Sequence, residues 1–382
     1  MTYRDSNEHR PPSSTDVLLR TTTAVPTGPP DHNAGVPAAP PRSAGHSSVD
    51  MVKAAQRTRL TGLGAGVVAG LVWGLAFLLP ELLHGWSAVT VTAGRYLVYG
   101  VLALVVLAVS GPALRAVARQ HWRPAVQFAI TGNVGYYLLL VLGVQAVGAP
   151  VTGIIIGAIP VTLAVVGNVV ARTYPWRWLI APVALVAVGL LIVNVLEMGG
   201  TSPRADSSVG VKVFGVLAAF GAVALWTWYG IANARFVERH PDVPNAGWST
   251  VVGLGTGAVA LALLPLAAVT GQLGGTGESH GAVGALLVTS IILGVAVSWG
   301  GTALWNVVSG RLPPTAAGML INVETLSGFA YVYIARGEWP PVGQLVGFAC
   351  ILAGVVVVMR LKTPGGGVPA EKYVRAGQGA FR

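Results

Sequence analysis

The sequence predicts an all-α integral membrane protein with ten transmembrane helices in two inverted five-helix repeats. Three observations lead to this fold class. Of the 382 residues, 53% are hydrophobic and only 10% are charged, whereas a soluble domain carries about 25% charged residues. Apolar runs follow one another between Gly62 and Met359, each close to the roughly 20 residues that cross a bilayer core. The second half of the chain also resembles the first.

The apolar runs divide into ten expected spans, five in each half of the chain. The first five are 62–82, 89–110, 124–145, 148–170 and 178–196. The second five are 213–234, 248–270, 283–308, 314–334 and 341–359. A very apolar soluble enzyme would show polar helix faces at a 3.6-residue period, and most of these runs have none.

Composition separates two tails from the membrane part. Residues 1–52 are rich in Pro, Ser, Thr, Gly and Ala and cannot bury enough apolar surface to offset their ordering entropy, so we expect a disordered tail. Residues 363–382 are Gly-rich and basic and form a second such tail. Between them we place the two repeats at 60–197 and 212–361. The single cysteine, Cys350, excludes an internal disulfide and a thiolate metal cluster. We therefore predict no metal and no cofactor.

Basic residues indicate the orientation in the membrane. The net charge of +10 could suggest a nucleic-acid partner, but no basic stripe interleaved with aromatic residues is present, and we predict none. Loops on one side hold only Arg204, Lys212 and Arg336. The tails and loops on the other side hold Lys53, Arg57, Arg59, Arg115, Arg119, Arg123, Arg172, Arg177, Arg235, Arg239, Arg311, Arg360 and Lys362. Because cytoplasmic loops carry the excess of Lys and Arg, we expect a multi-pass inner (plasma) membrane protein with both termini in the cytoplasm.

The halves align without gaps around the fourth and ninth spans. Pro150 then meets Pro314, and Arg172 meets Arg336. A five-span unit repeated once crosses the membrane an odd number of times, so its second copy enters from the opposite side. Inverted repeats of this kind occur in many secondary transporters, which bind substrate near the midplane between the repeats. Alternating access follows if the two halves exchange their arrangements.

Several short motifs follow in a specific order over about residues 60–361. They are Trp73-Gly74, Arg95-Tyr96, Gly148 to Pro150 leading to Pro160, Trp299 to Asn306, Arg311 to Pro314, and Arg336-Gly337-Glu338. With these motifs the chain resembles the EamA-type transporters of the drug/metabolite transporter superfamily. The resemblance implies a transporter of amino acids or similar small metabolites, often an exporter, and not an enzyme. Two departures from the family pattern are Glu324, at the place equivalent to Pro160, and Thr173-Tyr174 in place of Gly-Glu.

Two charged residues inside the spans are the first site candidates. Glu324 lies near the middle of span nine, where an ionised carboxylate is costly unless it faces a wet cavity or a partner. We predict that it binds substrate and couples transport to protons; the alternative is a structural carboxyl group hydrogen-bonded to a neighbouring helix. Arg95 could bind a substrate carboxylate, pair with Glu324, or extend to the membrane interface.

Aromatic and amide side chains inside the spans would suit an amphipathic ligand such as an amino acid. The predicted substrate-binding set is Trp73, Tyr99, Tyr136, Tyr137, Trp228, Trp299, Trp305, Asn306, Asn322 and Tyr331, with Arg95 and Glu324. The alternative roles are helix packing and anchoring at the membrane interface. Pro80 and Pro160 would break or kink their helices and are predicted hinges.

The sequence leaves other functions open besides a proton-coupled exporter. The same fold could import a nutrient or act as a uniporter without coupling. A non-transporting receptor or scaffold should have a tightly packed repeat interface with no central polar cavity. A membrane-embedded enzyme lacks a nucleophile–base pair in this sequence.

Overall fold

The computed structural model describes residues 48–361, apart from 82, 84–85, 198–207 and 275–282. Every extended regular element in this part of the chain is a helix. Almost all of the expected tails, 1–52 and 363–382, lie outside the described residues. Residues 48–52, which we assigned to the first tail, form the start of the first helix.

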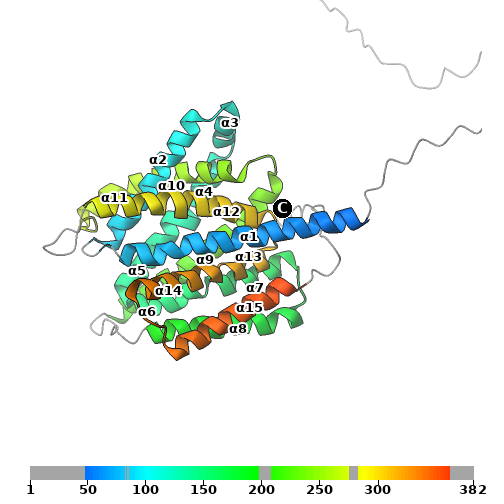
Figure 1. Cartoon of the computed structure of the whole chain (residues 1–382). Coiled ribbons are helices and arrows are strands. Elements are labelled where there is room, and N and C mark those ends of the chain that lie inside the picture. Colours follow the sequence, from blue (N-terminus) through cyan, green and yellow to red (C-terminus); the bar gives the residue numbers. More distant parts are fainter. Residues whose placement is uncertain (1–47, 82, 84–85, 198–207, 275–282, 362–382) are drawn as a thin grey trace, which may run out of the picture. The chain divides into compact units, whose positions relative to one another are not determined.

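Figure 1 shows the helices lying side by side in a bundle. The first half consists of α1 (Ser48–Glu81), α2 (Ala88–Val109), α3 (Pro112–Gln120), α4 (Trp122–Phe128), η1 (Ala129–Val134), α5 (Gly135–Val147), α6 (Ala149–Gly157), α7 (Ile159–Ala171) and α8 (Trp176–Glu197). The second half consists of α9 (Val209–Arg239), α10 (Asn245–Val269), α11 (Val283–Ile292), η3 (Leu293–Gly300), α12 (Gly301–Ser309), α13 (Pro314–Leu320), α14 (Asn322–Arg336) and α15 (Val342–Arg360).

Among the described residues, nine helical segments are long and apolar enough to cross a membrane. Each overlaps one of the ten expected spans. The expected ninth span, 314–334, is missing from this set. It is divided at Ile321 into α13, with 7 residues, and α14, with 15 residues, and, unlike the fourth span, which is also divided but belongs to the set, it contains Asn322 and Glu324 and is less apolar. Neither part is long enough to cross a bilayer alone.

Four interruptions occur inside the spans, two in each half of the chain. The segments η1 and η3 are π-helical and continue directly into α5 and α12. The other two interruptions are at Ala158, between α6 and α7, and at Ile321, between α13 and α14. π-Helical segments are rare and frequently mark functional sites, which directs attention to the residues beside η1 and η3.

The connection between the second and third spans contains α3, a helix that the sequence analysis did not predict. Its apolar side chains Leu114, Val117 and Ala118 pack against a buried cluster that includes Trp248. Arg115 and Arg119 are exposed. The helix is therefore amphipathic and lies on the end of the bundle.

Close glycine contacts bring pairs of helices together. A Cβ atom added to Gly100 on α2 would lie 2.6 Å from the Cα of Gly257 on α10, and the reverse distance is also 2.6 Å. On α1, a Cβ atom at Gly70 would lie 2.6 Å from Val323, and one at Gly74 would lie 2.2 Å from the Ser327 hydroxyl. Small residues of this kind allow helix backbones to approach closely in membranes.

The outward faces of the spans are apolar. On α9, for example, Leu217 and Phe220 are 64% and 56% exposed. Similar exposed Leu and Val side chains occur on α2, α8, α11 and α15. A surface of this kind is stable in lipid and not in water, so the chain is a multi-pass membrane protein.

Candidate functional site

The candidate site is built around Arg95, on the face of α2 that packs against η3. The Arg95 Nε group donates a hydrogen bond of 2.8 Å to the Ser298 hydroxyl in η3. The Arg95 guanidinium carbon also lies 5.4 Å from the centre of the Tyr96 ring. Arg95 is half-buried. Ser298 binds only Nε, so the two terminal nitrogens of the guanidinium keep their donors for another partner.

Glu324 is the acidic partner of this region. It lies in the first turn of α14, directly after the interruption at Ile321. This part of α14 packs closely on α1, since a Cβ atom at Gly70 would lie 3.0 Å from the Glu324 backbone nitrogen. The Glu324 side chain is half-buried. A carboxyl group inside a span is costly unless water or a partner reaches it.

Arg95 and Glu324 interact electrostatically but do not form an ion pair within the described chain. Instead, the hydroxyl of Ser298 holds the guanidinium. Two opposite charges in the membrane interior are thus close enough to affect each other and still separate. A ligand that carries both charges could fit between them.

Two phenol groups from the third span complete this region. Tyr136 and Tyr137 follow η1 directly, at the start of α5. Tyr136 interacts electrostatically with both Glu324 and Arg95, and Tyr137 interacts with Arg95. Both tyrosines are half-buried. The structure therefore brings together four of the predicted residues, from α2, α5 and α14.

Three other predicted aromatic residues form hydrogen bonds in or near η3. Trp73 Nε1 donates 3.0 Å to the carbonyl oxygen of Val297 in η3. Trp299 Nε1 donates 2.9 Å to the Thr250 hydroxyl on α10. The Tyr99 hydroxyl donates 2.7 Å to the carbonyl oxygen of Ser249 and is fully buried. The two tryptophan bonds connect η3 to α1 and α10, and the Tyr99 bond connects α2 to α10.

Trp305 and Asn306 are buried between helices. Trp305 is 2% exposed, and its ring centre lies 5.5 Å from that of Trp73. Asn306 is fully buried in an amide network: its Oδ1 accepts 2.9 Å from Asn233 Nδ2, and its own Nδ2 donates 3.1 Å to the carbonyl oxygen of Asn245. In this arrangement both residues pack inside the bundle, and their role in substrate binding stays a prediction.

Asn322 is also fully buried, at the interruption that precedes Glu324. Its Nδ2 donates 2.9 Å to the carbonyl oxygen of Met319, one of the groups that a helix end leaves without an intrahelical partner. Asn322 thus stabilises the turn between α13 and α14. Glu324 follows two residues later, in the first turn of α14.

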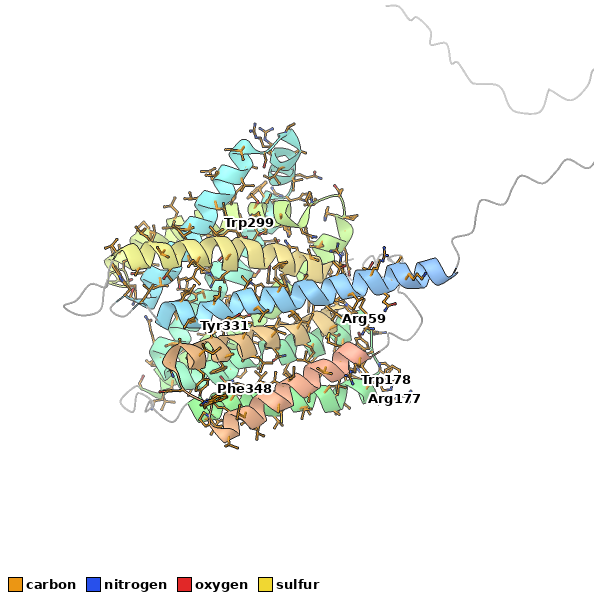
Figure 2. The ribbon with its side chains drawn as sticks, viewed as in Figure 1. Arg59, Arg177, Trp178, Trp299, Tyr331 and Phe348 are labelled. Carbon is orange, nitrogen blue, oxygen red and sulfur yellow. The ribbon has the colours of Figure 1, made fainter. Side chains whose placement is uncertain are left out.

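Trp228 and Tyr331 contact neighbours other than Arg95 and Glu324. Trp228 is 47% exposed on the face of α9 that also presents Leu217 and Phe220, and its ring centre lies 6.0 Å from that of Phe128. The Tyr331 hydroxyl donates 3.1 Å to the carbonyl oxygen of Leu71. Figure 2 shows Tyr331 where α14 adjoins α1.

The two predicted hinges have different positions. Pro160 is buried and occupies the first turn of α7, directly after the interruption at Ala158. Pro80 is the residue before the end of α1; its side chain lies outside the described residues. Only Pro160 thus lies at a break inside a span.

Sequence reasoning missed Ser298 and Thr250, the hydroxyl partners of Arg95 and Trp299. It also missed both π-helical segments. Ser and Thr are common in apolar spans, so neither residue type distinguishes a site. The only available signal was that Ser298 precedes Trp299 directly.

Comparison with known proteins matches the chain twice to the EamA-like transporter family, over residues 60–195 and 213–360. Inner membrane protein YtfF of Escherichia coli (strain K12) is 32% identical over 311 residues. This alignment covers 79% of the present chain and 96% of YtfF.

A solved crystal structure has a similar fold. It superposes with a TM-score of 0.62 at 18% sequence identity, and the match covers 78% of this chain and 96% of that one. At this identity the likeness shows the fold alone.

Proposed function

Because this chain belongs to the EamA-like transporter family of transmembrane transporters, we propose that it is a secondary transporter of a small zwitterionic metabolite, such as an amino acid. It works by alternating access between two inverted five-helix repeats in the inner membrane. Both termini lie in the cytoplasm, and the proposed direction is export. Four features of the molecule support parts of this proposal.

The first feature is the matching of interruptions between the halves. The π-helical segments η1 and η3 lie in the third and eighth spans, and the breaks at Ala158 and Ile321 lie in the fourth and ninth. An aromatic ring also packs against a glycine at each π-helical segment. Tyr229 packs against Gly132 within η1, and Trp73 packs against Gly301, directly after η3. These pairs are expected if the second half repeats the first.

The second feature is the direction of neighbouring helices. On α1 and α14, Gly70 approaches Val323 and Gly74 approaches Ser327, so these helices run parallel. By contrast, α8 and α15 run antiparallel, since Gly189 approaches Ile351 whereas Leu196 approaches Gly343. Ten crossings in alternating directions require both relations.

The third feature is the combined length of α13 and α14. Together with Ile321 they span 314–336 and rise about 35 Å at about 1.5 Å per residue. This length exceeds the roughly 30 Å of a bilayer core. The pair can therefore serve as the ninth of ten spans, with its break near the middle, as in other transporters built from discontinuous helices.

The fourth feature is the separated charge pair, and it carries the substrate assignment. Terminal nitrogens of Arg95 suit a substrate carboxylate, and Glu324 suits a substrate ammonium group. Tyr136 and Tyr137 lie within electrostatic range of Arg95 and add amphipathic surface for a side chain. A ligand with one charge only would leave the other protein charge without a partner in the membrane interior, which is costly.

Proton coupling through Glu324 is part of the same proposal. A carboxyl group on a water-accessible space inside the membrane can take up a proton on one side and release it on the other. Alternate occupancy by a proton or by substrate ammonium would make the movements of the two exclude each other. This exchange would use the inward proton gradient to drive export.

Counterflow in proteoliposomes tests the proposed function. Vesicles loaded with a mixture of isotopically labelled amino acids are placed in unlabelled mixture, and mass spectrometry measures which labels leave. We expect at least one amino acid to exchange faster than in protein-free vesicles. If no label exchanges, the zwitterion assignment is refuted. A protein that binds an amino acid without moving it would favour the receptor alternative.

A further inference from the structure

A cavity of about 400 Å³ lies at the turn between α7 and α8, away from Arg95 and Glu324. It is lined by Asn168, Val169, Arg172, Tyr174 and Trp176. The turn joins the ends of two spans, so the cavity lies at the level where a membrane meets water. The transport mechanism proposed above uses none of these side chains.

Arg172 holds an unusual backbone conformation in this turn. Its φ angle is 49°, and it is the only residue other than glycine with a positive φ in the described part of the chain. A side chain makes this left-handed conformation unfavourable. The corresponding turn after α14 uses Gly337, with φ 67°. A non-glycine residue in this conformation is uncommon and suggests a functional reason for the arginine side chain.

A buried amide holds the turn in place. Asn168 is 2% exposed; its Nδ2 donates 3.0 Å to the carbonyl oxygen of Tyr174, and its Oδ1 accepts 2.9 Å from the Tyr174 backbone N–H. The two bonds close the loop over Arg172. The backbone next to the arginine is thus fixed by both ends of the Asn168 amide.

The Arg172 side chain is exposed, and no residue of the described chain forms a hydrogen bond or ion pair with its guanidinium. Arg177 lies nearby in sequence, with its guanidinium carbon 6.0 Å from the Trp178 ring centre. Figure 2 shows Arg177 and Trp178 at the same end of the bundle as Arg59. This end therefore carries several positive charges and an unpaired guanidinium beside a cavity.

The wall of the cavity is amphipathic. Val169 is 57% exposed on the outer face of α7, and Trp176 is 45% exposed. Exposed Val side chains suit lipid, and Trp side chains gather at the headgroup level of membranes. A free anion would have no use for the apolar side.

We propose that this cavity binds the headgroup of an anionic phospholipid, with Arg172 on the phosphate and Val169 beside the glycerol and acyl region. Basic pockets between spans at the cytoplasmic side are suited to such headgroups. In the proposed orientation the ligand is a lipid of the inner leaflet.

Native mass spectrometry of the full-length protein tests the site. Delipidated protein is mixed with phosphatidylglycerol or with phosphatidylcholine, and retained lipid is counted. We expect wild type to retain one phosphatidylglycerol about tenfold more strongly than phosphatidylcholine, the effect of one charge-assisted contact. Arg172→Asn and Arg172→Gly should both lose this preference. Asparagine and glycine tolerate the left-handed backbone, so these changes remove the charge and keep the turn.

Arg311→Gln is the matched control, because Arg311 is exposed at the same end and packs beside Gly62 of α1. It removes the same charge and should keep the preference. If both Arg172 variants retain phosphatidylglycerol as wild type does, or if Arg311→Gln loses it equally, the proposal is overturned. A third arm adds inorganic phosphate: complete displacement of the lipid at millimolar phosphate would reassign the site to a free anion.

Discussion

Replacing Arg95 by glutamine removes the guanidinium charge and keeps a hydrogen-bonding side chain on the same face of α2. In the structure Nε donates to the Ser298 hydroxyl at 2.8 Å, and the terminal nitrogens are not used by this bond. The proposed substrate carboxylate would bind these two nitrogens. The change thus removes the contact with substrate and leaves the helix packing around Tyr99 intact.

The size of the effect follows from the kind of bond that is lost. A hydrogen bond to a charged group contributes about 1.5–3 kcal/mol, so Arg95→Gln should raise KM about 10- to 150-fold. Ser298→Ala removes only the neutral partner that orients the guanidinium. Its expected cost of about 0.5–1.5 kcal/mol corresponds to a rise of about 2- to 12-fold.

The assay is initial-rate uptake into proteoliposomes over a concentration series of the amino acid that counterflow identifies. Arg311→Gln is again the control, since it removes an arginine that is far from the site in the chain and exposed. An Arg95→Gln protein that is folded, as judged by size-exclusion chromatography, and has the KM of wild type would refute the role of Arg95. An equal loss in Arg311→Gln would show that net charge alone is responsible.

Three other changes test separate parts of the molecule. Glu324→Gln should abolish the dependence of transport rate on pH while counterflow continues; unchanged pH dependence in proteoliposomes would rule out coupling at this residue. Gly100→Val places a Cβ atom 2.6 Å from the Cα of Gly257, so α2 and α10 must separate by roughly 1 Å, and overpacking of this kind costs about 1–3 kcal/mol. The thermal midpoint should fall for Gly100→Val and stay unchanged for Gly64→Val, because a Cβ atom at Gly64 meets nothing within 4 Å. Burial and the neighbouring His240 ring lower the pKa of His121, against the opposite effect of Asp242. The unfolded chain therefore takes up a proton at higher pH than the folded protein, so stability is lost as the pH falls below the ordinary value of 6.5. His121→Phe should reduce this loss between pH 7 and pH 5 in thermal scans, and an unchanged loss would assign it to other groups.

Most of the fold could be predicted because membrane spans are defined by long apolar runs. The nine apolar helical segments of the described chain overlap nine expected spans, and the tenth, which contains Asn322 and Glu324, is less apolar than the others. The π-helical segments could not be predicted, because a π-turn needs only one extra residue in a helix and leaves no change in hydropathy. Helix α3 was missed for a related reason: its Arg115 and Arg119 made the segment appear to be a loop.

The site was predicted best where charge was the signal. Arg95 and Glu324 are conspicuous in apolar spans because a buried charge is expensive, and the structure brings them near Tyr136. Asn306 was less informative, because an amide in a span can equally satisfy another amide, as it does with Asn233. Trp228 shows the same limit for aromatic residues: lipid and a binding site both accept an indole ring.

The two halves also differ in how they break their fourth and ninth spans, and this difference bears on function. In the first half Pro160 follows the break and is buried, and its ring ends the helix by removing a backbone donor. The second half has Glu324 at the equivalent place, so the break there needs another cause, and the Asn322 amide on the Met319 carbonyl oxygen supplies it. A proline at 324 would make the break but carry no charge. Because Asn322 stabilises the break, position 324 is available for a carboxyl group in the first turn of α14. The repeat without a proline at this place is therefore the one that supplies Glu324 to the proposed site, and the repeat with Pro160 supplies Arg95 from α2.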